Sequence, residues 1–204
     1  MKKSKKYKKR FDANLIIAFG VLLASIGALM ISTRQASIMN EQTKIFLEQS
    51  KSSAWPSLSI GMSRSFDNDT LNKYSLIISN RGIGPAIVTE TKITFDGKPI
   101  SNWEEFYKVA KIPDTIVKRH GNDILLNRVI KPGEDFLLID WSLNPLLMNY
   151  IYKYSDKISI RICYKSVFGD YWEVVRKGFK NNLEKSITTE VSNYKASEDI
   201  LFLE

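Results

Sequence analysis

The chain is poor in the residues that most often build reactive or metal-binding sites. Its 204 residues include one cysteine and one histidine. A single cysteine excludes an intramolecular disulfide framework and every site that needs several cysteines. A single histidine excludes the zinc motifs built on histidine pairs. We therefore expect neither a metal nor another cofactor.

The net positive charge is small outside the first residues. The formal net charge is +8, but residues 1–12 hold seven lysines and arginines against the single acid Asp12, which leaves +2 for all that follows. The high isoelectric point therefore describes a basic tail and not a basic domain. We expect no nucleic-acid partner.

Residues 13–32 contain no charged side chain, and half of them are Leu, Ile, Val or Phe. About 20 apolar residues are enough for a helix to cross the hydrocarbon core of a bilayer. A cleaved secretory signal is the competing interpretation, but its apolar run is shorter and ends in small residues. Here Leu29, Met30 and Ile31 occupy that place, which favours an uncleaved signal-anchor in the lipid bilayer.

The flanking charges predict the orientation of this segment. Seven basic residues precede it, whereas only Arg34 and Lys44 occur in the next eighteen residues. This asymmetry predicts a cytoplasmic N-terminus and an extracytoplasmic remainder, in a single-pass protein of the plasma (inner) membrane. The lysine run could also bind anionic lipid or nucleic acid, but an orientation signal explains it fully.

Two patterns suggest that copies of the chain associate. Small residues recur every four positions within the span, a spacing that lets membrane helices approach closely. Residues 33–54 lack glycine and proline and are predicted to continue the helix as a stalk. A heptad of isoleucines alternating with glutamines runs along this stalk, typical of a soft coiled coil. The alternative is a monomeric polar helix. The residues concerned are Gly20, Ala24 and Ala28 in the span, then Ile31, Ile38, Ile45 and Ser52 with Gln35, Gln42 and Gln49.

After Trp55 and Pro56 the hydrophobic period changes from helical to alternating, which places a domain at residues 55–180. Leu58, Ile60 and Met62 show the pattern of a strand with one buried face. Similar runs separated by turn residues predict about seven strands, in an antiparallel β-sandwich of immunoglobulin-like type. Residues 181–204 fit a helix or a strand equally well.

Two short helices are predicted to interrupt the strands. Ser101 and Glu104 have the spacing of a capping box, and Asn144-Pro145 is a typical helix start. Each helix carries an apolar stripe. Core packing explains both stripes better than an exposed partner-binding surface, because exposed aromatic stripes favour aggregation.

The most distinctive stretch is Asn80-Arg81-Gly82-Ile83-Gly84-Pro85-Ala86. It lacks the third glycine of a dinucleotide-binding loop and the Gly-Lys-Ser/Thr of a phosphate loop, and Pro85 removes one amide donor. We expect a structural turn in which the glycines adopt positive φ.

Three further candidates for chemistry are weak. His120 lies in a polar loop, and no serine occupies a nucleophile-elbow context. Cys163 is expected on the polar face of its strand as a free structural cysteine without a partner base. Asp67-Asn68-Asp69 begins like a calcium loop, but Leu71 replaces a ligand, so we expect a polar turn.

Two motifs of the domain resemble those of a loose group of uncharacterised bacterial proteins. These have a signal-anchor, a glutamine-containing juxtamembrane helix and a small β-sandwich. The resemblance spans about residues 10–175, and it implies location and fold but no activity. The group commonly has a basic residue before the proline that opens the domain, where this chain has Trp55. The motifs are Asn80-x-Gly82-x-Gly84-Pro85-Ala86 and Tyr164-x-x-x-Phe168-Gly169-x-Tyr171.

These observations lead to one expected function and one alternative. We expect a non-enzymatic envelope protein that presents a β-sandwich to a protein partner, for example as an accessory subunit of a membrane complex. The alternative is a membrane-tethered enzyme with a cryptic site near His120.

Overall fold

The computed structural model describes residues 12–116, 121–180, 185–195 and 201–203. The chain divides into two compact units, Met1–Ser50 and Lys51–Glu204, which are described separately. The basic tail before Asp12 and the candidate residue His120 lie outside the described residues.

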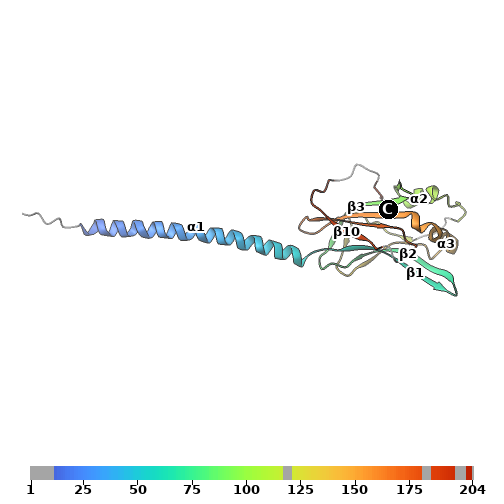
Figure 1. Cartoon of the computed structure of the whole chain (residues 1–204), viewed down its shortest axis with the longest axis horizontal. Coiled ribbons are helices and arrows are strands. Elements are labelled where there is room, and N and C mark those ends of the chain that lie inside the picture. Colours follow the sequence, from blue (N-terminus) through green and yellow to red (C-terminus); the bar gives the residue numbers. More distant parts are fainter. Residues whose placement is uncertain (1–11, 117–120, 181–184, 196–200, 204) are drawn as a thin grey trace, which may run out of the picture. The chain divides into compact units, whose positions relative to one another are not determined.

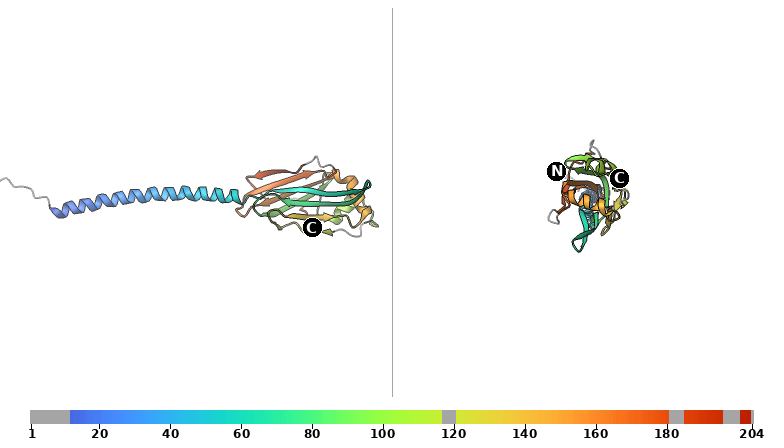
Figure 2. Two further views of the ribbon diagram at one scale, coloured as in Figure 1. Left: turned by 90° about the horizontal axis from the view of Figure 1, so that it is seen from below. Right: turned by 90° about the vertical axis from the view of Figure 1, so that its right-hand side faces the viewer.

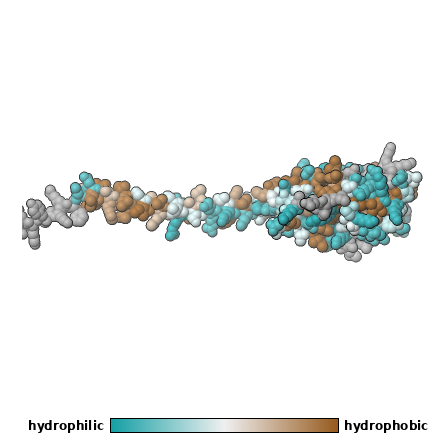
Figure 3. All heavy atoms as spheres, turned by 90° about the horizontal axis from the view of Figure 1, so that it is seen from above, coloured by the Kyte–Doolittle hydropathy of each residue, from teal (hydrophilic) through white to brown (hydrophobic). Residues whose placement is uncertain are grey.

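The first unit is dominated by α1 (Ala13–Ser53), a helix of 41 residues whose last three residues belong to the second unit (Figure 1). None of its residues is buried within the chain. By length and composition the helix could cross a membrane once. Apolar side chains cover its first part and polar ones its second part (Figure 3). The predicted helix across the span and the stalk is thereby confirmed.

The second unit is mainly β, with two antiparallel sheets that lie in two layers (Figure 2). The first sheet has the strand order β1-β2-β7-β5 and the second the order β10-β9-β8-β3-β4, with β6 paired to β3. The strands are β1 (Leu58–Asp67), β2 (Thr70–Asn80), β3 (Ala86–Phe95), β4 (Lys98–Ile100), β5 (Gly121–Asn122), β6 (Val129–Ile130), β7 (Asp135–Asp140), β8 (Ile158–Lys165), β9 (Tyr171–Lys177) and β10 (Ile187–Val191).

One hydrophobic core fills the space between the sheets, as in a β-sandwich. Alternate residues of the long strands point into it, and helices α2 (Trp103–Val109) and α3 (Pro145–Tyr154) add their apolar stripes. Trp103, Phe106 and Leu147 are almost completely buried. The prediction that these stripes pack into the core is confirmed.

The cap of α2 differs from the prediction by one residue. Asn102, not Ser101, is the N-cap, and its side-chain oxygen accepts a hydrogen bond from the amide of Glu105. The Glu105 carboxylate in turn accepts from the backbone amide of Ser101 at 2.7 Å. Sequence reasoning chose the wrong register because Ser and Asn cap helices about equally well.

The turns follow their expected chemistry. Asn68 and Asp69 adopt positive φ between β1 and β2, as do Asp96 and Gly97 between β3 and β4. This is the conformation of tight two-residue hairpins. Residues 67–70 therefore form a polar turn, as predicted.

The end of the chain completes both the sheet and the core. β10 pairs with β9 at the edge of the second sheet. Phe202 is buried, lies 4.9 Å from the ring of Trp103, and donates its amide to the carbonyl of Thr91. In its described residues, the segment for which the sequence left helix and strand open therefore contains a strand and a core residue.

Side chains of the second sheet cover part of the free edge of β1. The Leu58 amide donates to the Tyr164 hydroxyl, and the Leu58 carbonyl accepts from Thr188. The Ile60 carbonyl accepts from the buried Arg176 at 2.9 Å. Because an open strand edge invites pairing with another chain, these contacts protect the sandwich from edge-to-edge association at this point.

Candidate functional site

Asn80 fixes the segment that connects α1 to the domain. Its side-chain oxygen accepts from the amides of Ser57 (3.2 Å) and Gly82 (3.0 Å), and its side-chain nitrogen donates to the carbonyls of Gly84 (2.9 Å) and Ile130 (3.0 Å). The residue is completely buried. All four hydrogen-bonding positions of the amide are thus satisfied.

The backbone of the turn after Asn80 is also hydrogen-bonded to this segment. The amides of Ile83 and Gly84 both donate to the carbonyl of Trp55, at 3.0 and 3.1 Å. Pro85, which has no amide to donate, leads directly into β3. The stretch that the sequence singled out therefore holds the backbone of Trp55 in place.

The reason expected for the two glycines is wrong. Neither Gly82 nor Gly84 is among the glycines with positive φ. Instead, a Cβ atom on Gly82 would lie 2.4 Å from the Trp55 oxygen, and one on Gly84 would lie 1.9 Å from the Ala54 oxygen. Glycine is required here because two backbone segments are in direct contact.

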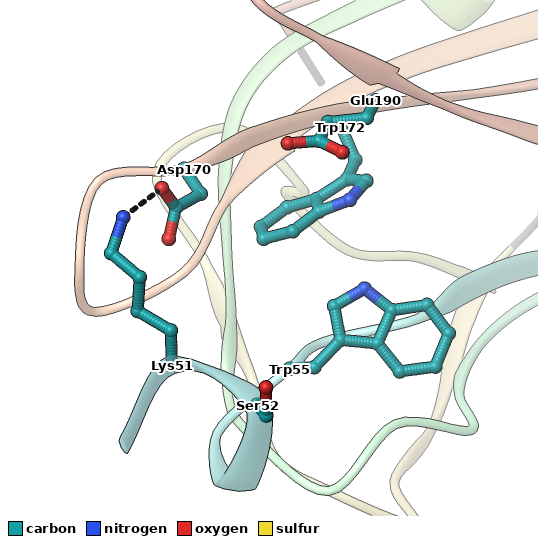
Figure 4. Close-up of a pocket in the computed structure, with 6 residues that line it drawn as sticks. All are labelled: Lys51, Ser52, Trp55, Asp170, Trp172 and Glu190. Atoms are coloured by element: carbon teal, nitrogen blue, oxygen red, sulfur yellow. Dashed lines mark hydrogen bonds and ion pairs between the residues drawn. The ribbon is translucent and has the colours of Figure 1, made fainter. Parts of the chain in front are cut away.

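A cavity of about 440 Å³ opens beside this connecting segment (Figure 4). We call it the tryptophan pocket, and it is lined by Lys51, Ser52, Trp55, Asp170, Trp172 and Glu190. The indole rings of Trp55 and Trp172 lie on opposite sides of the cavity in this view, and the Glu190 carboxylate lies next to Trp172. The pocket thus combines aromatic surface with ionised groups.

The surrounding structure fixes the indole of Trp172 and the backbone of Trp55. Trp172 is 9% exposed and stacks on the buried ring of Tyr164, with centroids 6.0 Å apart. Trp55 is 46% exposed, and its backbone is held by the turn described above. One wall of the pocket is therefore rigidly packed, and the other carries a large apolar side chain open to solvent.

Of the two acidic side chains that line the pocket, one has an ionic partner and the other has none. Lys51 and Asp170 form an ion pair of 2.6 Å. Glu190 lies opposite Trp172 in the β9–β10 register, and its carboxylate has no ionic or hydrogen-bonding partner among the described residues. The lining therefore has one uncompensated negative charge.

A second polar cluster lies on the outer face of β3, β8 and β9. Arg161 pairs with Glu173, the buried Glu90 accepts from the Tyr194 hydroxyl at 3.4 Å, and Cys163 is buried below them. Burial raises the pKa of the Cys163 thiol to about 11. The thiol is protonated at neutral pH, so it is a structural group here and a poor nucleophile.

Cys163 provides a pH-dependent prediction. The folded pKa of about 11 lies above the ordinary value of 9.0, so only the unfolded chain releases the proton as pH rises through this interval. We expect the free energy of unfolding to fall between pH 9 and 11, and to fall less in Cys163→Ser. Denaturant titrations of both proteins measure this difference. Equal slopes would contradict the assigned pKa.

The structure distributes the sequence candidates over separate places. Asn80, Gly82 and Gly84 contact the backbone of residues 54–57, the segment that carries Trp55 of the pocket, and Pro85 follows them in the chain. The span and stalk candidates are exposed on α1, namely Gly20, Ala24, Ala28, Ile38 and Ile45.

Sequence reasoning missed Asp170, Trp172 and Glu190 as neighbours of the connecting segment. Asp170 lies within the motif from Tyr164 to Tyr171, and Trp172 directly follows it. Nothing in the pattern indicated that this hairpin meets residues 51–55. Glu190 lies in the segment whose structure was left open.

Comparisons with family models, curated proteins and solved structures found no match for this chain.

Proposed function

We propose that the protein is a non-enzymatic, single-pass envelope protein whose extracytoplasmic domain binds a protein partner, as an accessory subunit of a membrane complex would. The observation that carries this proposal is the tryptophan pocket, an open cavity of about 440 Å³ with aromatic walls and an uncompensated carboxylate. Cavities with apolar walls and a few oriented polar groups are typical of binding sites.

The strand order supports an immunoglobulin-like domain. In that fold one sheet has the strands A-B-E-D and the other contains C, F and G. Taking β1, β2, β7 and β5 as A, B, E and D makes β3, β8 and β9 the strands C, F and G. β4 then corresponds to the extra strand C′, and β10 is an addition beside G. Domains of this architecture commonly act by binding.

The helix α1 and its flanking charges support the location. The helix could span a bilayer, and the excess of lysine and arginine before it favours a cytoplasmic N-terminus. The domain would then lie outside the cytoplasm of the host cell.

Orientation can be tested with a cysteine in the exposed polar part of α1. In a Cys163→Ser background, we expect Ser37→Cys to react with a membrane-impermeant maleimide in intact cells or after opening of an outer membrane. A cysteine at Ser4 in the basic tail serves as the matched control and should stay unlabelled until the inner membrane is lysed. The reverse pattern would contradict the orientation.

Self-association through α1 is part of the proposal. With 3.6 residues per turn, the small residues of the span and the Ile/Gln seam of the stalk fall within an arc of about 100°. Because α1 is continuous, both patterns lie along one face of a single helix. A second copy of the chain could cover this face from the span to the stalk.

Partner binding can be tested by photo-crosslinking in cells. Ile83 and Val167 are exposed next to the pocket, since the Ile83 amide bonds to Trp55 and Val167 lies in the turn that carries Asp170. We expect a photoreactive residue at either position to give a discrete adduct with a protein. The same residue at Asn68, in the β1–β2 turn, should give none. Absence of adducts from both pocket positions would contradict the proposal.

A further inference from the structure

We propose that the tryptophan pocket recognises an alkylammonium group. This inference deepens the proposed binding function and rests on it. The group could belong to a lysine side chain of the partner or to a small quaternary amine, since both present the same positive charge on an apolar stem.

The charge of the pocket selects a cation. Asp170 is already neutralised by Lys51, whereas the Glu190 carboxylate has no partner among the described residues. Glu190 is exposed at the edge of the pocket, so it repels an anion and attracts a cation, whereas a neutral apolar ligand gains nothing from its charge. A positively charged group supplies the missing partner.

The aromatic walls favour a cation with an apolar stem over a bare metal ion. An indole ring attracts an ammonium group placed within about 6 Å of its face, and tryptophan is the strongest of the aromatic side chains in this role. Trp55 offers an indole that is 46% exposed, and Trp172 provides a second one that is packed against Tyr164. Figure 4 shows these rings on opposite sides of the cavity, with Glu190 next to one of them.

One ammonium group of the chain already pairs with a carboxylate of this pocket. The Lys51 side chain reaches Asp170 from the last turn of α1, at the border of the same pocket. Glu190 is a second carboxylate on the lining of this pocket, next to the indole of Trp172.

The experiment uses the full-length chain labelled with 5-fluorotryptophan in a non-ionic detergent, which carries no ammonium group of its own. The chain has four tryptophans, for which four fluorine NMR signals are expected. Trp103 and Trp141 are completely buried and serve as internal references. Choline and n-butylammonium are the probes, and 3,3-dimethylbutanol, a neutral compound with the shape of choline, is the control.

We expect at least one ammonium probe to shift the signals of Trp55 and Trp172 while the reference signals stay in place. Tighter binding of n-butylammonium would indicate that the natural ligand is a lysine side chain of the partner. Tighter binding of choline would indicate a small quaternary amine. Glu190→Gln should weaken binding by up to about fivefold, the range of an exposed ion pair, and Asp67→Asn, which removes an exposed carboxylate in β1, should leave it unchanged.

Three results would overturn the inference. These are equal binding of 3,3-dimethylbutanol, equal affinity of Glu190→Gln and the unchanged protein, and the absence of any shift of Trp55 and Trp172. If any of these results were obtained but protein adducts still formed at Ile83 and Val167, only the ligand class would be wrong and the proposed binding function would remain supported. If no adducts formed at these positions, the proposed binding function would be contradicted as well.

Discussion

Replacing Gly84 with alanine should strongly destabilise the domain. The new Cβ would lie 1.9 Å from the carbonyl oxygen of Ala54, a backbone atom that cannot rotate away. We expect the free energy of unfolding to fall by about 3 kcal/mol or more. For a domain of this size the midpoint of thermal unfolding should then fall by roughly 10 °C, as calorimetry of the full-length protein would measure.

Gly61→Ala is the matched control. At Gly61 in β1 the added Cβ would meet only the Ile77 oxygen, at an ordinary distance of 3.7 Å. We expect little change in stability there, because alanine fits the space and adopts strand geometry more readily than glycine. If both variants unfolded at the same temperature, the connecting segment would have to be loosely held, contrary to the hydrogen bonds of Trp55.

Replacing Ala24 with leucine should abolish most self-association of the full-length protein in membranes. Close approach of two helices depends on small side chains at the contact, and a leucine on this face would push the backbones apart. Ile38→Asp combined with Ile45→Asp should have the same effect in the stalk, since like charges would meet in the seam. Cross-linking in membranes measures both effects.

Residues on other faces of α1 provide the controls. Ala18 lies about 120° around the helix from Ala24, so Ala18→Leu adds the same bulk to the span without entering the proposed contact. Asn40→Asp with Leu47→Asp adds the same charges to the stalk on the opposite face. Undiminished cross-linking of Ala24→Leu, or equal loss in Ala18→Leu, would show that the small-residue face is not the contact.

The local elements were predictable because their signals are local. The uncharged run from Ala13 predicts a helix through the spacing of its own residues. The alternation of Leu58, Ile60 and Met62 predicts a strand in the same way. Asp96-Gly97 forms the hairpin turn that its tolerance of positive φ indicates. In each case the residues that determine the structure are neighbours in the chain.

The tryptophan pocket was not predictable because its walls come from residues far apart in sequence. Lys51 and Asp170 are 119 positions apart, and Glu190 reaches the site only because β10 pairs with β9. The conspicuous glycines predicted a turn, but not that the turn would press against residues 54–57. Cys163 shows the same limit, because alternation assigned it to the outer face but could not show that Tyr194 lies nearby.

The sequence by itself determined that this chain has a long apolar helix followed by a mainly β domain, since period and composition are properties of short segments. Only the tertiary structure decided which ends of those strands meet. Pairing of the strands and burial of the core bring Trp55, Trp172 and Glu190 to one cavity, and such long-range contacts depend on the packing of the whole domain.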